Sequence, residues 1–530
     1  MRRVAVAALL VACSEPLPPN AGGDPFWVEV DTTGGTDLGF VPERIEDAAP
    51  AGRLRLIDVT ADVGLGDGVG GGNSHGVGIA FVDLSGDRWP DIFVANGRDQ
   101  DGTQVPSLYY ENQRDGTFLD RTSAAGFGVL ANANLFSVAA ADYDGDGDVD
   151  LYVGASQGDV LMKNQGDATF VDATVESDAG GPPSEPALFG DGRSKVVSFG
   201  DFDGDGHLDI VSASSALPAP GAYLLKNDGD GTFTDITASS GVTIEPSGNP
   251  CAVLWSDYDA DGDQDLWIWN DRGGHVLLRN DGGRFANVTD DALDVGIRHP
   301  MGIDGADIDH DGDLDYYVSN IGDNPLLRNN GDGTFSDITD QAGTGGDYGW
   351  GLSFEDFDLD GWPDLFVAQE DDRPHLLFAH DGQVPPTFER IELNHPGVIS
   401  SRRAHNVAAG FADYDKDGRV DVVLAGTDGR PIRLYRNETP VGDHRYLHVY
   451  VEPSAGNGTG VTARVAVKSG ELVQFYDILG GSSRASQNEH SARFGLGPYT
   501  GAEWVVVLWP NGQYDVWRNV EGNQQHTLAP

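Results

Sequence analysis

The sequence is short of cysteine, of basic side chains and of long apolar runs. Cysteine occurs only at Cys13 and Cys251, which leaves no room for a framework of several disulfides. No run approaches the roughly 18 apolar residues of a membrane-spanning helix. The 33 Lys and Arg residues face 85 Asp and Glu residues, and the formal net charge of −52 disfavours nucleic acid and anionic lipid as partners. We therefore expect a cation to be the partner of so many carboxylates.

Glycine, by contrast, is abundant, with 73 of the 530 residues. Glycine weakens helix interiors and supplies turns, so this composition favours a turn-rich, all-β protein over packed helices. The length suits two to four domains of roughly 150 residues. Cys251 begins an apolar stretch, where a small buried side chain is a better interpretation than a catalytic thiol.

The N-terminus has the pattern of a secretion signal. A basic start precedes the apolar run Val4–Ala12, which is too short to span a bilayer. Its last residues and Cys13 resemble the lipobox of bacterial lipoproteins, and this resemblance implies lipidation of Cys13. A plain cleaved signal or a wrongly chosen start codon is the alternative. Residues 1–13 are thus the predicted signal, and residues 14–53, rich in Pro, Gly and acidic residues, are the predicted flexible linker.

One motif, Asp-x-Asp-x-Asp-Gly-x-x-Asp, organises the rest of the chain. Its first aspartates recur at steps of 49 to 59 residues, which indicates a repeat architecture. The first copy is degenerate, with serine at its third position and Arg88 in place of glycine. The candidate ligands are Asp83, Ser85, Asp87 and Asp91; Asp142, Asp144, Asp146 and Asp150; Asp201, Asp203, Asp205 and Asp209; Asp257, Asp259, Asp261 and Asp265; Asp307, Asp309, Asp311 and Asp315; Asp356, Asp358, Asp360 and Asp364; and Asp413, Asp415, Asp417 and Asp421.

Short apolar runs flank each motif, and a second pair of runs follows it. The first pair predicts a β-hairpin around the acidic loop. The second pair, as in 224–237, surrounds an Asn/Asp/Gly turn. Four short strands for each repeat are typical of one β-propeller blade. The seventh repeat lacks its last strand, but a matching segment, Leu56–Thr60, precedes the first repeat. We therefore predict an all-β, seven-bladed propeller over 54–440, closed by this N-terminal strand.

The acidic loops have the composition of calcium sites. Positions 1, 3, 5 and 9 offer carboxylates, position 7 offers a carbonyl, and glycine at position 6 permits a positive φ. Oxygen-only ligands in a flexible loop favour Ca²⁺ over Zn²⁺ and Mg²⁺. Solvated Asp-Gly turns are the alternative. We predict up to seven structural Ca²⁺ ions. The first site should be the weakest, or empty, because Ser85 replaces a carboxylate and Arg88 brings a positive charge.

These repeats resemble the FG-GAP/VCBS repeats of integrin α-subunit propellers and their bacterial relatives. The resemblance implies calcium loops on one face that do not catalyse, and partner binding on the other face or along the rim. Beyond Pro440, strand-like runs predict a small β-sandwich over 441–530. Its motifs resemble the ASPIC/UnbV domain of the cartilage acidic protein family and its bacterial members: Gly458–Val465, Gly480–Asn488, Phe494–Gly497 and Trp509–Gly512. Gly480–Asn488 is either a functional loop or a glycine-rich connection.

Polar residues lie eight positions before each first aspartate. Along a strand this spacing would place them roughly 25 Å from the acidic loops, at the opposite mouth of a central channel. They are a candidate ring for a ligand or a transition metal, or ordinary polar loop residues. The seven residues are His75, Asn134, Arg193, Asn249, His299, Tyr348 and His405.

These observations favour a non-enzymatic binding or adhesion protein for extracellular protein or glycan. We expect a secreted monomer or a cell-surface or outer-membrane lipoprotein of a bacterium, attached to a membrane only through a lipid anchor. The alternative is a calcium-dependent polysaccharide lyase or hydrolase with its site at the channel mouth. No nucleophile elbow, phosphate-binding glycine loop or His-Glu-x-x-His motif supports the enzyme. Adaptation to high salt would also explain the acidity, but not an activity.

Overall fold

The computed structural model describes most of the chain between residues 34 and 529. The described residues are 34–46, 48–65, 69–70, 77–96, 105–155, 158–180, 195–214, 221–244, 249–271, 274–293, 296–297, 299–369, 373–391, 408–426, 430–452 and 457–529. Within these ranges nearly all regular structure is β-strand, as predicted. The helices among them are short, and none is long and apolar enough to cross a membrane.

Within the described part of the chain, repeats 1 to 6 each contribute four antiparallel strands to one sheet, and repeat 7 contributes three strands to a sheet that β2 completes. The strands are β4 (Gly78–Val82), β5 (Asp91–Ala95), β6 (Leu108–Asn112) and β7 (Phe118–Asp120) in repeat 1; β8 (Leu135–Ala141), β9 (Asp150–Ala155), β10 (Val160–Asn164) and β11 (Phe170–Asp172) in repeat 2; and β12 (Lys195–Gly200), β13 (Asp209–Ser214), β14 (Ala222–Asn227) and β15 (Phe233–Asp235) in repeat 3. Repeats 4 and 5 contain β16 (Pro250–Ser256), β17 (Asp265–Asn270), β18 (Val276–Asn280), β19 (Phe285–Asn287), β20 (Pro300–Ala306), β21 (Asp315–Asn320), β22 (Leu326–Asn329) and β23 (Phe335–Asp337). Repeats 6 and 7 contain β24 (Gly349–Glu355), β25 (Asp364–Gln369), β26 (Leu376–His380), β27 (Phe388–Ile391), β28 (Ala408–Ala412), β29 (Asp421–Ala425) and β31 (Arg433–Asn437), and β2 (Leu56–Asp58) joins repeat 7.

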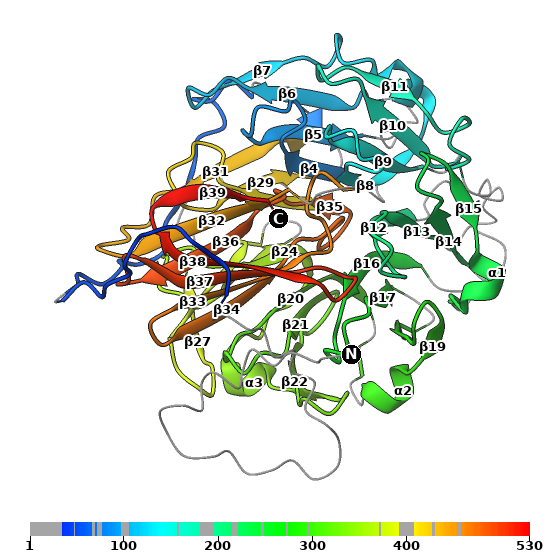
Figure 1. The fold of residues 1–530 in the computed structure, drawn as a ribbon. Coiled ribbons are helices and arrows are strands. Elements are labelled where there is room, and N and C mark those ends of the chain that lie inside the picture. Colours follow the sequence, from blue (N-terminus) through cyan, green and yellow to red (C-terminus); the bar gives the residue numbers. More distant parts are fainter. Residues whose placement is uncertain are drawn as a thin grey trace.

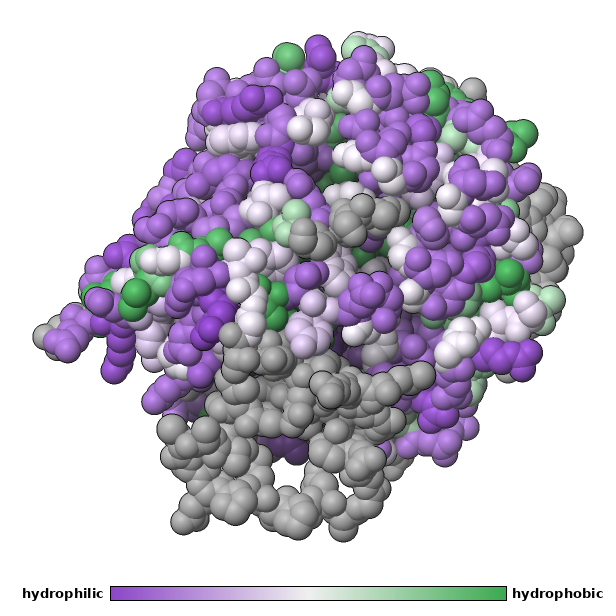
Figure 2. Space-filling view, viewed as in Figure 1, coloured by the Kyte–Doolittle hydropathy of each residue, from purple (hydrophilic) through white to green (hydrophobic). Residues whose placement is uncertain are grey.

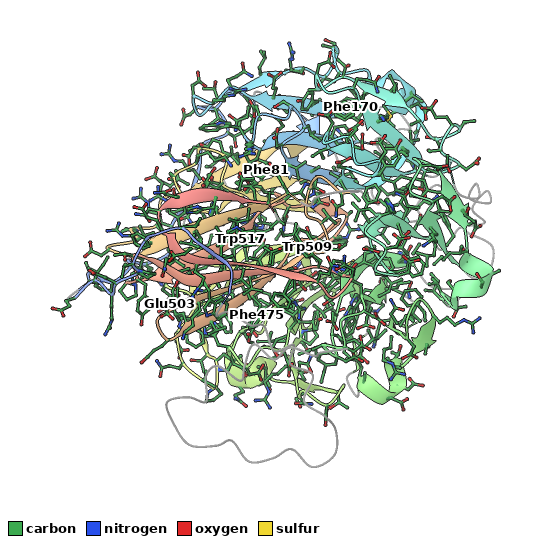
Figure 3. The ribbon with its side chains drawn as sticks, viewed as in Figure 1. Phe81, Phe170, Phe475, Glu503, Trp509 and Trp517 are labelled. Carbon is green, nitrogen blue, oxygen red and sulfur yellow. The ribbon has the colours of Figure 1, made fainter. Side chains whose placement is uncertain are left out.

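The strand that begins each repeat contacts the first strand of the next repeat. The series runs through β4, β8, β12, β16, β20, β24 and β28, and β28 in turn contacts β4. Figure 1 shows the repeat sheets following one another from blue through green to yellow. Apolar side chains fill the space between neighbouring sheets, as Phe93 and Val138 do between repeats 1 and 2. Burial of both faces explains why the strands are almost continuously apolar. In Figure 3, Phe81 lies on β4 and Phe170 lies farther out on β11.

Strand β2 pairs antiparallel with β31, with Leu56 opposite Asn437. This is the pairing that the sequence predicted for Leu56–Thr60. The hairpins around the acidic loops are also confirmed, for example by the antiparallel pairing of β8 with β9. The second hairpin of repeat 3 forms between β14 and β15.

Short elements complete the repeats. They are the 3-10 helix η2 (Phe127–Asn132), the helices α1 (Thr237–Ser240), α2 (Thr289–Ala292) and α3 (Thr339–Ala342), and the paired strands β3 (Val69–Gly70) and β30 (Arg430–Pro431).

Residues 441–529 form what we call the C-terminal unit, which consists of two sheets. The first has the order β1-β38-β37-β33-β34 and the second the order β36-β32-β39. The strands are β1 (Thr36–Asp37), β32 (Arg445–Val451), β33 (Arg464–Ser469), β34 (Leu472–Asp477), β36 (Ala492–Gly497), β37 (Gly501–Leu508), β38 (Tyr514–Glu521) and β39 (Gln524–Leu528). The strand-like runs that the sequence shows beyond Pro440 include β32, β33, β34 and β37. Side chains of the two sheets share one apolar core, which also includes residues of repeats 2 and 3.

The predicted flexible linker, residues 14–53, requires a correction. Strand β1 extends the first sheet of the C-terminal unit by parallel pairing with β38. Ile45 N–H donates to the carbonyl of Pro498 at 2.8 Å, and Gly52 N–H donates to the carbonyl of Pro440. The described part of this segment is therefore not a free tether, because it adds strand β1 to the edge of that sheet. Residues 1–33, including Cys13, lie outside the described residues.

The surface reflects the composition. Figure 2 shows a visible face made mostly of hydrophilic side chains, as the formal net charge of −52 would suggest.

Candidate metal centres

Each acidic loop is folded around the carboxylate at its position 1. In repeat 2, the N–H groups of Gly145 and Asp146 donate to Asp142 Oδ1 at 2.8 and 3.1 Å, and Gly147 N–H donates to Asp142 Oδ2 at 2.9 Å. The N–H groups at positions 5 and 6 make the same bonds in the other six loops. These bonds curl the backbone so that the other carboxylates face the same space.

Two positions of each loop have positive φ. Glycine at position 6 has φ between +91° and +97° in repeats 2 to 7, as its identity predicted, and Arg88 has φ of +69° in repeat 1. Position 4 also has positive φ, and there the residue is Gly, Ala, His, Leu or Lys. The sequence did not reveal position 4 because no single residue type marks it. A side chain there is strained, so the loop hydrogen bonds must hold it in place.

The carboxylates at position 9 are buried at the end of the hairpin. In repeat 2, Asp150 accepts hydrogen bonds from Tyr143 N–H at 3.3 Å and Asn164 N–H at 2.7 Å. Burial outweighs these bonds and raises the pKa of Asp150 to about 9. Burial also raises the pKa of its six counterparts: Asp91, Asp209, Asp265, Asp315, Asp364 and Asp421. A nearby cation would favour the charged form of these groups.

Position 3 carries the most direct sign of a metal ligand. In repeats 2, 4, 5 and 7 the Oδ1 atom of this aspartate is buried and receives no hydrogen bond from any described residue: Asp144, Asp259, Asp309 and Asp415. A buried carboxylate oxygen without a partner is costly, and a cation would remove that cost. In the loops of repeats 2 to 6, three carboxylates have oxygens within 4.8 Å of one another: Asp142, Asp144 and Asp146; Asp201, Asp203 and Asp209; Asp257, Asp259 and Asp265; Asp307, Asp309 and Asp311; and Asp356, Asp358 and Asp360. The residues present fit Ca²⁺, which takes six to eight oxygen ligands.

Lysines lie beside two of the loops. Lys163 contacts Asp144 and lies 3.1 Å from Asp146 in repeat 2. Lys226 contacts the third and fifth positions of repeat 3 in the same way. A metal ion in these loops would have an ammonium group as its neighbour. The ammonium group makes the net charge of the acidic site less negative.

The loop of repeat 1 differs from the expectation for Arg88. Its Nη2 lies 2.7 Å from Glu452 of the C-terminal unit, so the guanidinium makes its ion pair outside the loop. Arg114 instead places Nε 2.6 Å from Asp87 Oδ2. The positive charge beside this loop comes from the turn that follows the third strand, a position that the motif alone does not include.

Amide side chains link neighbouring repeats just beneath the loops, and the sequence analysis did not single them out. Asn164 Nδ2 donates to the carbonyl of Leu84 in the preceding repeat at 2.9 Å. The equivalent bonds run from Asn227 to Tyr143, Asn280 to Phe202, Asn329 to Tyr258, Asn437 to Phe357, and Asn112 of repeat 1 to Tyr414 of repeat 7, while His380 Nε2 meets the carbonyl of Ile308. The signal in the sequence is an asparagine that ends the third strand of every repeat except repeat 6.

The polar ring is only partly described. His75, Arg193 and His405 lie outside the described residues, whereas Asn134, Asn249, His299 and Tyr348 lie within them. Two members meet at a shared partner: His299 Nδ1 lies 2.9 Å from Asp271 Oδ1, and Asn249 Nδ2 lies 3.5 Å from Asp271 Oδ2. Tyr348 instead packs against the guanidinium of Arg373, 3.8 Å from the ring centroid, and has φ of +55°.

The segment 480–490 lies buried among the first strands of the repeats, and we call it the central segment. Phe199 N–H donates to the carbonyl of Gly480 at 2.8 Å, and Leu352 N–H donates to Ser483 Oγ at 2.7 Å. Its strand β35 (Ser486–Gln487) pairs in parallel with β4, and Asn488 Oδ1 accepts the N–H of Phe411 at 3.2 Å. The loop Gly480–Asn488 therefore ties the C-terminal unit to repeats 1, 3, 6 and 7.

A cavity of about 80 Å³ lies beside this segment. Its walls include Asp304 and Glu355, two carboxylates on first strands where other repeats have small or apolar residues. Burial raises the pKa of Asp304 to about 7. Glu355 Oε1 accepts a hydrogen bond from Arg493 Nη2 at 2.5 Å, so its charge is already paired. The two carboxylates thus have different environments.

Two family models match the sequence. The FG-GAP-like repeat model matches residues 83–153, 142–212, 201–268, 257–318 and 307–367, which together cover more than half of the chain. The chain belongs to the FG-GAP-like repeat family. The ASPIC and UnbV model matches residues 453–530, so both expected resemblances are confirmed. The matched repeats and the four-stranded sheets assign the β-propeller fold.

This FG-GAP-like repeat protein is similar to cartilage acidic protein 1 of Homo sapiens, with 28% identity over 224 residues, which cover 41% of the chain and 30% of the relative. The Xenopus tropicalis protein is 28% identical over 222 residues, covering 41% and 31%. The match therefore spans less than a third of these curated relatives. Among solved structures, it is similar to an Agrocybe aegerita lectin that recognises non-reducing terminal N-acetylglucosamine (19% identity, 65% of this chain, 91% of that chain, TM-score 0.41) and to Bacillus licheniformis rhamnogalacturonan lyase (14%, 72%, 75%, TM-score 0.39).

Proposed function

We propose that the chain is a seven-bladed β-propeller, closed by β2, whose acidic loops hold structural Ca²⁺. The contact between β28 and β4 and the bond from Asn112 to the carbonyl of Tyr414 support closure, because both join the last repeat to the first. The buried, unpartnered oxygens at position 3 carry the metal proposal. Positions 1, 3, 5 and 9 would be the carboxylate ligands, and the ion would offset the repulsion between them.

We further propose that this propeller is a binding or adhesion module for protein or glycan, without chemistry of its own. The loop face contacts the C-terminal unit, so the opposite face and the rim are the surfaces that a partner would use. The expected location is outside the cell or at the cell surface, on the basis of the signal-like pattern in residues 1–13.

The alternative is a calcium-dependent lyase or hydrolase. Among the described residues, the carboxylates Asp304 and Glu355 in the ≈80 Å³ cavity favour it. An acid and base pair needs two groups that can exchange protons with a substrate. The ion pair of Glu355 with Arg493 opposes that role.

Isothermal titration calorimetry of the chelated chain with Ca²⁺ tests the metal proposal, and the expected result is several bound ions. A glycan array and a panel of extracellular proteins, each probed with the calcium-loaded chain, test the binding proposal. Turnover of polysaccharide, lost in Asp304→Asn, would instead favour the enzyme. An absence of calcium binding would overturn the structural role of the loops.

A further inference from the structure

The C-terminal unit lies directly against the acidic loops. Gly458 N–H donates to Asp142 Oδ2 of repeat 2 at 2.9 Å. His444 Nδ1 lies 3.1 Å from the carbonyl oxygen of Asp358 in the loop of repeat 6. The C-terminal unit thus contacts both a ligand carboxylate and the loop backbone. In Figure 1 its orange and red strands lie against the repeat sheets.

Two glycines of the C-terminal unit approach position 1 of these loops too closely for any side chain. A Cβ atom at Gly495 would overlap Asp356 Oδ2 and lie 2.5 Å from the carbonyl carbon of Leu359. A Cβ atom at Gly458 would overlap Asp142 Oδ2, well inside the 3.0 Å below which real Cβ atoms essentially never approach. Neither glycine has a φ in the left-handed region. The need for glycine therefore comes from nearby loop atoms, which are the two carboxylates and, at Gly495, also the backbone of Leu359. It does not come from the backbone conformation of the glycines.

Buried charges fix this docked arrangement. Arg493 and Glu489 of the C-terminal unit meet Glu355 and Lys416 of the propeller, and all four side chains are largely buried. Glu489 Oε2 also accepts the N–H of Asp413, position 1 of repeat 7, at 3.1 Å. Burial would raise the pKa of Glu489, but Lys416 and Arg493 outweigh burial and lower it to about 2. Separation of the two parts would leave these charges without their partners, at a large cost in free energy.

We propose that docking of the C-terminal unit and metal binding by the loops of repeats 2 and 6 are reciprocally coupled, with Gly458 and Gly495 as the points of contact. This inference rests on the proposed metal binding. A cation would fix the carboxylates of Asp142 and Asp356, against which the two glycines pack, whereas without it repulsion from neighbouring aspartates would loosen them. Because coupling is reciprocal, the docked unit would strengthen calcium binding by the same factor.

The direct test uses Gly458→Ala and Gly495→Ala in the full chain, with Gly345→Ala as the matched control. Position 345 has nothing within 4 Å of an added Cβ and no positive φ. Calorimetric titration should show that each interface variant weakens at least one class of calcium sites by about fivefold or more, while the control matches the wild type. Limited proteolysis should cut the C-terminal unit faster in both interface variants than in the control.

A second measurement keeps the inference testable if a variant does not fold. Hydrogen exchange of the wild-type chain, with and without calcium, should show slower exchange in 457–459 and 492–497 when calcium is bound. Calcium binding with equal affinity in variants and control, or exchange in these segments that calcium does not change, would overturn the coupling. A wild-type chain that binds no calcium would overturn the proposed metal sites themselves, so the two failures are distinguishable.

Discussion

The acidic loops of repeats 1 and 5 share one backbone shape but differ in the side chains that they present. In both loops, the N–H groups at positions 5 and 6 donate to the carboxylate at position 1. Position 6 has φ of +69° at Arg88 and +97° at Gly312. Repeat 1 has Ser85 at position 3, whereas repeat 5 has Asp309 with a buried oxygen that receives no hydrogen bond from the described residues. Loop shape and the supply of free carboxylate oxygens therefore depend on different positions.

Of the changes predicted here, removal of calcium should have the largest effect on the stability of the chain. A chelator should lower the melting temperature of the chain, because each ion bound only to the folded state contributes about 2.7 kcal/mol when free calcium is 100 times its Kd. Scanning calorimetry with and without chelator measures the change. An unchanged melting temperature would mean that the loops of repeats 2 to 7 are as independent of metal as repeat 1 is expected to be.

The pH dependence of the chelated chain should be the next largest effect. The pKa of Asp150 is raised to about 9 from its usual 3.8, so the folded state holds this proton more tightly than the unfolded state. The stabilisation is complete below about pH 4 and is lost as the pH rises through about 9. We expect the melting temperature of the chelated chain to fall from about pH 5 to about pH 9, with a smaller change when calcium is present. A melting temperature that rises over this range without calcium would contradict the assignment.

Exchange of loop residues between the two repeats should have the third largest effect. The double substitution Asp309→Ser with Gly312→Arg gives repeat 5 the side chains of repeat 1 at positions 3 and 6. We expect one fewer bound calcium and a loss of about 2.7 kcal/mol in the free energy of unfolding when free calcium is 100 times Kd. The converse pair, Ser85→Asp with Arg88→Gly, should strengthen the first site. Calorimetric stoichiometry measures both.

The matched control for this exchange is Asp332→Ser, an exposed turn residue of repeat 5. It should leave the number of bound ions unchanged. If the exchanged repeat 5 binds as many ions as the wild type, position 3 does not determine metal capacity.

Loss of one link between repeats should have the smallest effect. Asn112→Ala and Asn164→Ala each leave a buried carbonyl without its donor, at a cost of about 2 kcal/mol in the free energy of unfolding. If the ring is closed, repeat 1 packs against repeat 7 in the same way as repeat 2 packs against repeat 1. The two substitutions should then lower the free energy of unfolding by equal amounts. Urea unfolding measures both, and a much smaller cost at Asn112 would indicate an open ring.

Much of the propeller could be predicted from the sequence because its determinants are local. The aspartates and glycine of each loop fall within nine residues, and the flanking apolar runs reveal the hairpin. The pairing of Leu56–Asp58 with β31 could be predicted because the seventh repeat visibly lacked one strand. The conformation of position 4 could not, since residues as different as Gly204 and Leu359 adopt it under the same loop hydrogen bonds.

Docking of the C-terminal unit could not be predicted from the sequence, because it depends on contacts between distant segments. The glycines at 458 and 495 were visible as motifs, but the carboxylates that require them lie 316 and 139 positions earlier in the chain. Strand β1 has two residues and no apolar alternation, so composition alone suggested a linker. Its pairing partner Trp517 lies at the other end of the chain.

The position of the central segment also has a consequence for biosynthesis. A ribosome makes all seven repeats before it reaches residues 480–490, so the innermost strands of the nascent propeller lack several hydrogen-bond acceptors until translation is nearly finished. Any chaperone or export machinery that handles the unfinished chain would meet a propeller that still lacks its central segment.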